Sequence, residues 1–221
     1  MKYWVRYSKV GLTRYIGHLD MLHHWERILR RARLPLAFSQ GFSPHPLISV
    51  AAPLPVGQTS RAEYLELELT EQMSPASLQA AIASALPAEM ECLGAAAVPD
   101  GTKPLMGLIR FADYQLIGRG VADLRINVSD FSASPTCLLT VKRKGGMKEV
   151  DIRPLVHSLS VDEDNRLLAC LATGSTGNLR PEDLWRALAP GSPEAILRTE
   201  LYLLSGDRLL TPWQSLGVCA E

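Results

Sequence analysis

The order in which strand and helix patterns follow one another in the N-terminal half constrains the fold more than any other feature. Aromatic and β-branched residues first alternate with polar ones, which is typical of a strand. Apolar residues then recur at spacings of three and four, which is typical of a helix on a core. The patterns predict, in order, a strand at 2–9, a helix at 18–34, strands at 47–53 and 63–69, a helix from the capping residue Ser74 to about Leu86, and a strand at 89–98.

The C-terminal half repeats this order after a segment of linker composition at 99–104. Its patterns predict a strand at 112–118, a weakly marked helix within 121–131, strands at 135–144 and 165–173, a helix at 180–188 and a strand at 196–204. The order β-α-β-β-α-β is the ferredoxin-like pattern. We therefore expect an α+β protein with two tandem ferredoxin-like halves, at 1–99 and 105–221, and a mostly antiparallel sheet with helices on one face.

The charge balance excludes a general attraction to nucleic acid or to an anionic membrane. The 221 residues include 23 Lys and Arg and 23 Asp and Glu, so the formal net charge is zero. An anionic partner would have to bind at a local patch. The N-terminus lacks the long apolar run of a signal peptide, and no uncharged apolar stretch approaches the roughly 20 residues that span a bilayer. We expect a cytoplasmic protein with no membrane partner.

The cysteines and histidines do not show the spacing of a metal site. The four cysteines are far apart and form no C-x-x-C pair, so zinc-ribbon and iron–sulfur spacings are missing from the sequence. His18, His23 and His24 are spaced by five and six residues, whereas helical zinc pairs are spaced by four. We expect neither a metal nor a cofactor.

The helix at 18–34 has one polar face with the chemistry of a binding site. Asp20, His24, Arg27 and Arg31 follow one another at spacings of four, three and four, which places all four on the same face. A carboxylate, an imidazole and two guanidinium groups can bind a phosphate and move a proton. The alternative is a solvated helix face, with its acid at the N-terminal end and its arginines at the C-terminal end of the helix dipole.

Two loops are further candidates. The segment at 39–46 is a rigid connection rich in proline, glycine and hydroxyl groups, and it can present backbone N–H groups and His45 to a ligand or serve only as a connection. The segment at 142–154 places Lys142, Arg143, Lys144 and Lys148 around a glycine pair, with Arg153 close behind. It can track a nucleic-acid backbone or form a solvated hairpin.

Several of these segments together resemble the radical SAM-linked protein family. This is a bacterial domain of unknown function, found beside, or fused to the C-terminus of, a cobalamin-type radical SAM protein. One departure is Ser43, where many relatives have asparagine. The segments that carry the resemblance are Gly-His-Leu-Asp at 17–20, Glu-Arg at 26–27, 30–35, Phe-Ser-Gln-Gly-Phe-Ser-Pro-His-Pro at 38–46, Gly57, 60–63, Lys-Gly at 144–145, Val-Asp-Ile-Arg-Pro at 150–154 and Gly-Asn-Leu-Arg-Pro at 177–181.

The resemblance implies a partner and an RNA context. This chain lacks the closely spaced cysteines that hold a radical SAM cluster, so the radical chemistry would belong to a radical SAM partner. Relatives tend to be encoded near ribonuclease E/G and ribosomal proteins, which implies RNA rather than DNA. The positions that match the family's motifs are His18, Asp20, Arg27, Arg31, Ser39, His45, Glu63, Lys144, Asp151 and Arg153.

The sequence leaves three functions open. The first is a non-catalytic module that binds RNA, on a broad sheet face as RNA-recognition domains do, or presents a substrate to a radical SAM partner. The second is an RNA-modifying or RNA-cleaving enzyme, by analogy with the fold of pseudouridine synthases, with Asp20 or Asp151 as nucleophile and His24 or His45 as proton carrier. Asp20 and His45 are its main catalytic candidates. The third is a purely structural subunit of its partner.

Overall fold

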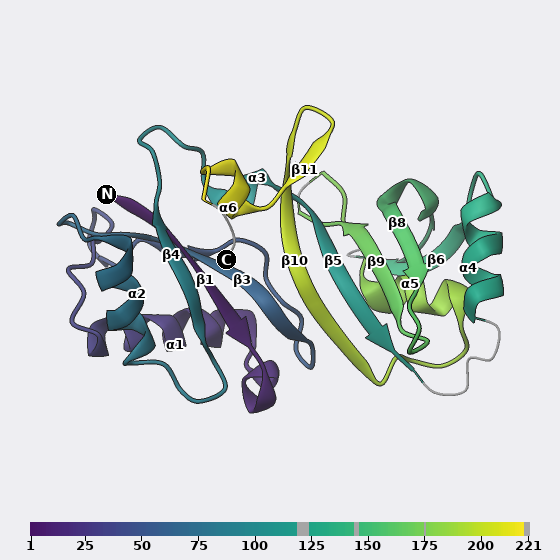
Figure 1. Ribbon diagram of the computed structural model, residues 1–221, viewed down its shortest axis with the longest axis horizontal. Helices are drawn as coiled ribbons and strands as arrows, with labels where there is room; N and C mark the ends of the chain where they lie inside the picture. Colours follow the sequence, from purple (N-terminus) through teal and green to yellow (C-terminus); the bar gives the residue numbers. More distant parts are fainter. Residues whose placement is uncertain (119–123, 144–145, 175, 219–221) are drawn as a thin grey trace. The chain divides into compact units, whose positions relative to one another are not determined.

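The computed structural model describes residues 1–118, 124–143, 146–174 and 176–218 (Figure 1). It is an α+β structure in which the strand pairs described below are antiparallel, and this confirms the predicted class. Contacts group the chain into two compact units. Unit 1 comprises Met1–Ile109 together with the segment from Leu201, and unit 2 comprises Arg110–Glu200. The predicted division into halves at 1–99 and 105–221 stays a prediction. In the structure, the segment from Leu201 packs within unit 1.

Unit 1 is built on three neighbouring strands in the order β4-β1-β3, with β2 also paired to β3. The predicted strand at 2–9 is confirmed at both ends, and the other strands and helices predicted at 1–99 are present with shifted ends. The elements of this half are β1 (Lys2–Lys9), the 3₁₀ helix η1 (Gly11–Tyr15), α1 (His18–Arg31), β2 (Ile48–Val50), β3 (Thr59–Glu68), α2 (Pro75–Ala83), β4 (Cys92–Ala97) and α3 (Leu105–Leu108).

Helix α1 ends at Arg31, three residues before the predicted end. Arg33 has a φ of +54°, a left-handed conformation that stops the helix. The Leu34 N–H then donates to the Leu29 carbonyl at 3.2 Å, which is the hydrogen bond of a Schellman cap. Glycine usually occupies this capping position because it has no Cβ to strain. An arginine is therefore an unusual choice here.

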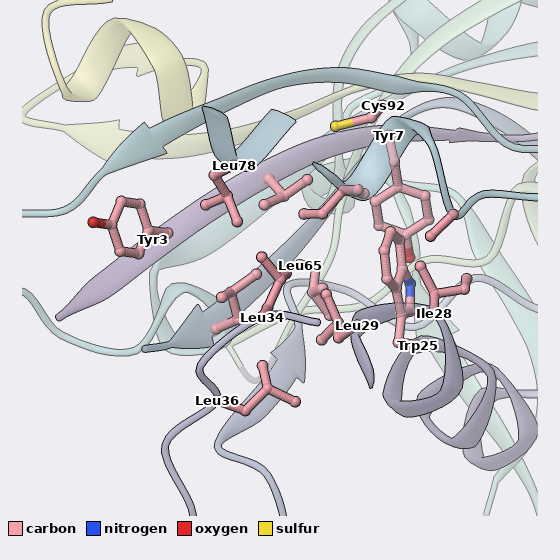
Figure 2. Packing of buried hydrophobic residues seen from close by; sticks show 14 of the residues in the cluster. Tyr3, Tyr7, Trp25, Ile28, Leu29, Leu34, Leu36, Leu65, Leu78 and Cys92 are labelled. Atoms are coloured by element: carbon pink, nitrogen blue, oxygen red, sulfur yellow. The ribbon is translucent and has the colours of Figure 1, made fainter. Parts of the chain in front are cut away.

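The core of unit 1 lies between its strands and the helices α1 and α2. Alternate residues of β1 and β3 face both helices, and Leu65, Leu67 and Leu69, which alternate with polar residues, are fully buried. The Tyr7 and Trp25 rings meet edge to face with centroids 4.7 Å apart, and Figure 2 shows them among the side chains of β1, α1 and α2. Burial of these large aromatic rings contributes strongly to the stability of unit 1.

The opposite face of these strands is also covered. The short helix α6 (Pro212–Ser215) places Trp213 edge to face against Tyr64 of β3, with ring centroids 5.4 Å apart. A Cβ on Gly94 of β4 would lie 3.2 Å from the same indole. The prediction of helices on one face is therefore wrong for α6, because the returning C-terminal segment brings an aromatic side chain to the far side of the strands.

Unit 2 contains the part of β10 before Leu201 and the strands β5, β9 and β8, in the order β10-β5-β9-β8, together with a separate hairpin of β6 with β7. The strand predicted at 135–144 forms as β6 but does not join the sheet. Strand β6 pairs with β7 instead. The strand next to β9 is β8, which the sequence patterns did not predict. The elements are β5 (Ile109–Ile117), α4 (Leu124–Ala133), β6 (Leu138–Arg143), β7 (Gly146–Asp151), η2 (Arg153–Leu155), β8 (Val156–Val161), β9 (Leu167–Ala172), α5 (Pro181–Leu188) and β10 (Ala195–Ser205).

The missed strands have weak local signals. β7 reads Gly-Met-Lys-Glu-Val-Asp and is exposed over its first four residues, while most of β8 is exposed or half-buried at one end of the strand order. Edge strands of this kind lack the apolar alternation by which strands are recognised. Three residues of β10 also pair with β11 (Arg208–Leu210): Leu203 with Leu210, Leu204 with Leu209 and Ser205 with Arg208. Within the described ranges, no helix is both long and apolar enough to cross a bilayer.

Candidate functional site

Helix α1 presents an exposed polar face, as its spacing predicts. Its buried side chains are Met21, Trp25, Ile28 and Leu29, and these form the stripe that packs on the sheet. The side chains of Asp20, Arg27 and Arg31 are exposed on the remaining surface, and that of His24 is half-buried. Asp20 lies in the first turn, where the positive end of the helix dipole stabilises a carboxylate.

The C-terminal end of α1 carries a group of four exposed arginines, which we term the arginine group. Its members are Arg27, Arg30, Arg31 and Arg33. Arg27 Nε donates to the His23 carbonyl at 3.3 Å, and Arg31 donates to the Ala85 carbonyl. In the part of the chain that the structure describes, no carboxylate comes within the 4.0 Å of an ion pair to any of the four. Their positive charge is therefore not neutralised locally.

His24 lies next to this group and shows its electrostatic effect. Burial lowers the pKa of His24 below the ordinary value, and the positive charges of Arg27 and Arg31 lower it further. Its Nε2 atom is buried and has no hydrogen-bond partner among the described residues. A neutral imidazole in a positive environment is a weak proton acceptor. This weakens the prediction that His24 carries a proton in catalysis.

The structure brings two of the predicted residues, His18 and Glu63, into one pocket. Lys9, at the end of β1, also lines it, and both Lys9 and Glu63 are only 3% exposed. The Lys9 Nζ atom donates to the Ile16 carbonyl at 2.9 Å. The cavity volume is about 10 Å³, which is room for one water molecule. A pocket of this size holds polar groups in the core of unit 1 and does not admit a larger ligand.

Ser39 and His45 also come together, because hydrogen bonds close the loop that contains them. The Ser39 N–H donates to the His45 carbonyl at 2.9 Å, and the His45 N–H donates to Ser39 Oγ at 3.1 Å. Ser39 Oγ lies 2.9 Å from His45 Nδ1. These three contacts fix the loop, and they support the prediction of a rigid connection without defining a catalytic pair.

His45 lines a second and larger pocket, with a volume of about 260 Å³, next to Ser49, Glu66 and Glu68. Sequence reasoning missed both glutamates, because their alternation with leucines in β3 predicts a solvated face. Glu66 is 8% exposed and accepts from Trp4 Nε1 at 2.9 Å and from the Leu105 N–H at 3.0 Å. Glu66 therefore stabilises the covered face of the sheet.

The basic hairpin forms as predicted, between β6 and β7. Lys142 is opposite Met147 and Arg143 is opposite Gly146 in the register. Lys144, another predicted binding residue, lies outside the described residues. Lys148 follows in β7.

Asp151 and Arg153 make local contacts that are sufficient to explain them. Asp151 Oδ1 accepts from the Cys137 N–H at 2.8 Å and the Arg153 N–H at 3.0 Å. The Arg153 guanidinium lies over the Phe131 ring, 5.5 Å from its centroid. Both residues therefore connect the base of the hairpin to the rest of unit 2. A binding role for either residue stays a prediction.

The described cysteines are poorly suited to bind a metal. Burial raises the pKa of Cys92 to about 11, and it also raises the pKa values of Cys137 and Cys170. A thiol must lose its proton to become a ligand, so raised pKa values oppose binding. Cys219 lies outside the described residues. Across those residues, no group of three or more His, Cys, Asp and Glu side chains is placed to hold a metal ion.

The comparisons with known proteins identify a family. A family model described as "Uncharacterized protein conserved in bacteria (DUF2344)" matches residues 2–181. The chain belongs to this family. Membership in DUF2344 confirms the prediction of a bacterial domain of unknown function, while the link to a radical SAM protein stays a prediction.

The other comparisons add little. No curated protein matches the chain. A chain in a crystal structure of a Cbf5-Nop10-Gar1 complex superposes with a TM-score of 0.49 at 11% identity, over 98% of this chain and 57% of that one. We draw no argument about function from a likeness of this degree.

Proposed function

We propose that this DUF2344 chain is a non-catalytic accessory module that binds RNA, and thereby presents a substrate, for a radical SAM partner. The observation that carries the proposal is the arginine group on α1. Four exposed guanidinium groups lie within seven residues of sequence, and no described carboxylate pairs with them. The net charge of the chain is zero, so this group is a local exception rather than a consequence of overall composition.

An uncompensated arginine group has a clear physical use. Guanidinium groups bind phosphate oxygens through paired hydrogen bonds, and each phosphate contact releases condensed counterions from the nucleic acid. An ion pair of one of these arginines would have to break before such a contact forms, and no carboxylate among the described residues is paired with the arginine group. The pKa of His24 is lowered mainly by burial, and the charges of Arg27 and Arg31 lower it further.

We further propose that both units have the ferredoxin-like fold. In unit 1 the elements β1, α1, β2, β3, α2 and β4 follow in the required order, with strand order β4-β1-β3 and β2 on β3. In unit 2 the strands β5, β8, β9 and β10 repeat this order, with the β6–β7 hairpin inserted before β8. RNA-recognition domains use the open sheet face. In unit 1 that face is covered by Trp213, which favours α1 as the RNA contact instead.

The enzyme alternative has less support from the geometry. His45 is fixed in its loop by Ser39 and lines the pocket with Glu66 and Glu68. Asp20 is exposed on α1 and lines neither this pocket nor the one at His18 and Glu63. The two main catalytic candidates therefore do not share either pocket.

The test is RNA binding across a salt series, measured by fluorescence anisotropy with labelled single-stranded and structured RNA. We expect the logarithm of affinity to fall linearly with the logarithm of salt concentration. The double substitution of Arg27→Ala and Arg30→Ala should reduce the slope by about one to two, because one phosphate contact is lost with each arginine. Lys142→Ala tests the hairpin of unit 2 in the same way.

A matched control is Arg166→Ala, because Arg166 is ion-paired to Asp162 and Asp164. It removes the same charge from a neutralised position and should leave the slope unchanged. Equal effects of the Arg27 and Arg166 substitutions would contradict a specific role for α1. The partner is tested separately, by co-expression with a cobalamin-type radical SAM protein and copurification. Failure to copurify would remove that part of the proposal and leave RNA binding standing.

A further inference from the structure

Phe42 is the most exposed large apolar side chain of the described residues. Its side chain is fully exposed, so it makes almost no contact with the rest of the protein. It lies between Gly41 and Ser43, in the loop that connects α1 to β2. Phe38, at the start of the same loop, is 42% exposed. A single exposed apolar residue needs no explanation, but this one lies on a loop that is held in place.

The loop has several internal restraints that limit its motion. An isolated antiparallel bridge joins Phe38 to Pro46 at its base. The hydrogen bonds between Ser39 and His45 close it, and the Ser43 carbonyl lies 3.5 Å from His45 Nδ1. The phenyl ring of Phe42 is thus carried at the tip of a fixed loop. Fixing the loop backbone before binding reduces the conformational entropy that binding would cost.

The loop that carries Phe42 follows the arginine group in the sequence. Arg33 precedes Phe42 by nine residues, a distance that cannot exceed about 30 Å even in a fully extended chain. Single-strand binding folds occupy sites of about 4 to 16 nucleotides, in which cationic groups contact phosphates and aromatic rings stack on bases. A short RNA strand is long enough to contact both features.

We propose that Phe42 is a stacking platform for an unpaired base of single-stranded RNA whose phosphates contact the arginine group. The proposal rests on the RNA-binding function proposed above and adds its substrate class. Every base has an apolar π-face, so a single ring can stack on any of them without reading sequence. A base inside a duplex has both faces covered, and Phe42 therefore distinguishes single-stranded from double-stranded RNA.

An exposed phenyl ring can also insert into an apolar pocket of a partner protein. The charges of the arginine group favour RNA over such a partner. Four uncompensated arginines complement a phosphate backbone, whereas an apolar pocket on a protein offers them no partner. The experiment below includes the protein partner as an outcome.

The experiment compares Phe42→Ala, Phe42→Trp and Leu12→Ala in the full chain. Leu12 is 72% exposed in the same unit, so its substitution is a matched control for loss of an exposed apolar group. The probes are a labelled single-stranded RNA of about ten nucleotides, the same strand in a duplex, and a strand containing 2-aminopurine. Stacking quenches 2-aminopurine fluorescence, which reports contact between ring and base. Thermal unfolding should be nearly the same for all variants, because Phe42 and Leu12 are both largely exposed.

We expect Phe42→Ala to lower the affinity for the single strand about tenfold, with an unchanged salt slope and no effect on the duplex. The 2-aminopurine quenching should disappear with Phe42→Ala and persist with Phe42→Trp, while Leu12→Ala has no effect. If the arginine substitutions flatten the salt slope but Phe42→Ala changes nothing, the stacking proposal is overturned and RNA binding stands. If no RNA binds and Phe42→Ala instead abolishes association with a protein partner, both proposals are overturned.

Discussion

At the scale of the residue, His24 shows how neighbouring charges act on one ionisable group. Its pKa is lowered by burial first and then by Arg27 and Arg31, and it has no compensating carboxylate among the described ion pairs. The neutral form is therefore favoured in the folded protein. Arg27 and Arg31, which add to the effect of burial on this imidazole, are also two of the charges that would attract a phosphate at the proposed site.

This lowered pKa predicts a pH dependence of stability. The unfolded chain binds more protons than the folded chain between the folded-state pKa of His24 and the ordinary value of 6.5. The free energy of unfolding should therefore fall as the pH drops through 6.5, stop falling below the folded-state pKa, and recover above 6.5. His24→Gln should remove this contribution. Urea unfolding of both proteins between about pH 5 and pH 8 checks it, and parallel pH profiles would show that His24 is not the group responsible.

At the scale of the element, the C-terminal end of α1 combines backbone strain at Arg33 with a positive charge that the proposed function uses. Arg33 adopts a φ of +54°, in the left-handed region that costs a residue with a Cβ about 1 kcal/mol or more. The Schellman cap needs this conformation, but it does not need an arginine. Backbone outliers of this kind often occur at functional positions. The location of Arg33 in the arginine group is consistent with selection for its charge.

Arg33→Gly should therefore separate stability from binding. Glycine removes the conformational strain, so the free energy of unfolding should rise by about 1 kcal/mol. The lost guanidinium should reduce the salt slope of RNA binding by about one. Arg33→Ala is the matched control, because it removes the charge and keeps the strain. Denaturant unfolding and the RNA salt series measure the two effects, and a fall in stability with Arg33→Gly would refute the argument.

At the scale of the whole molecule, each unit has its own aromatic anchor. Trp213 returns from the C-terminal segment to cover Tyr64 and Gly94 in unit 1. Trp185 of α5 is 1% exposed in unit 2, and a Cβ on Gly118 would overlap its ring. The segment from Leu201 onward is far in sequence from the strands that it covers, and it is nevertheless part of unit 1.

Trp213→Ala should weaken unit 1 selectively, by about 3 kcal/mol or more, because removal of a buried indole leaves a cavity. Hydrogen exchange read by mass spectrometry should then show faster exchange in β1, β3 and β4 than in β8 and β9. Trp185→Ala should give the reverse pattern with a loss of similar size. Equal loss of protection in all these strands for both variants would mean that the two units unfold as one.

The elements with local signals could be predicted from the amino-acid sequence. Alternation placed β1 at Lys2–Lys9, and a serine followed by proline marked the start of α2 at Pro75, where Ser74 accepts a hydrogen bond from the Ser77 N–H. The exposed face of α1 also followed from spacing alone. These features depend on residues within one or two turns of each other, and so a pattern is enough to predict them.

The pairing of the strands and the burial of polar groups could not be predicted in this way and depend on the folded arrangement of the chain. This arrangement placed β8 rather than β6 beside β9, covered Glu66 with Trp4 and the Leu105 N–H, and enclosed Lys9 with Glu63. In each case the outcome depends on contacts between residues far apart in the chain. The free energy of such contacts comes from surfaces that meet only after folding, and local sequence patterns carry no record of them.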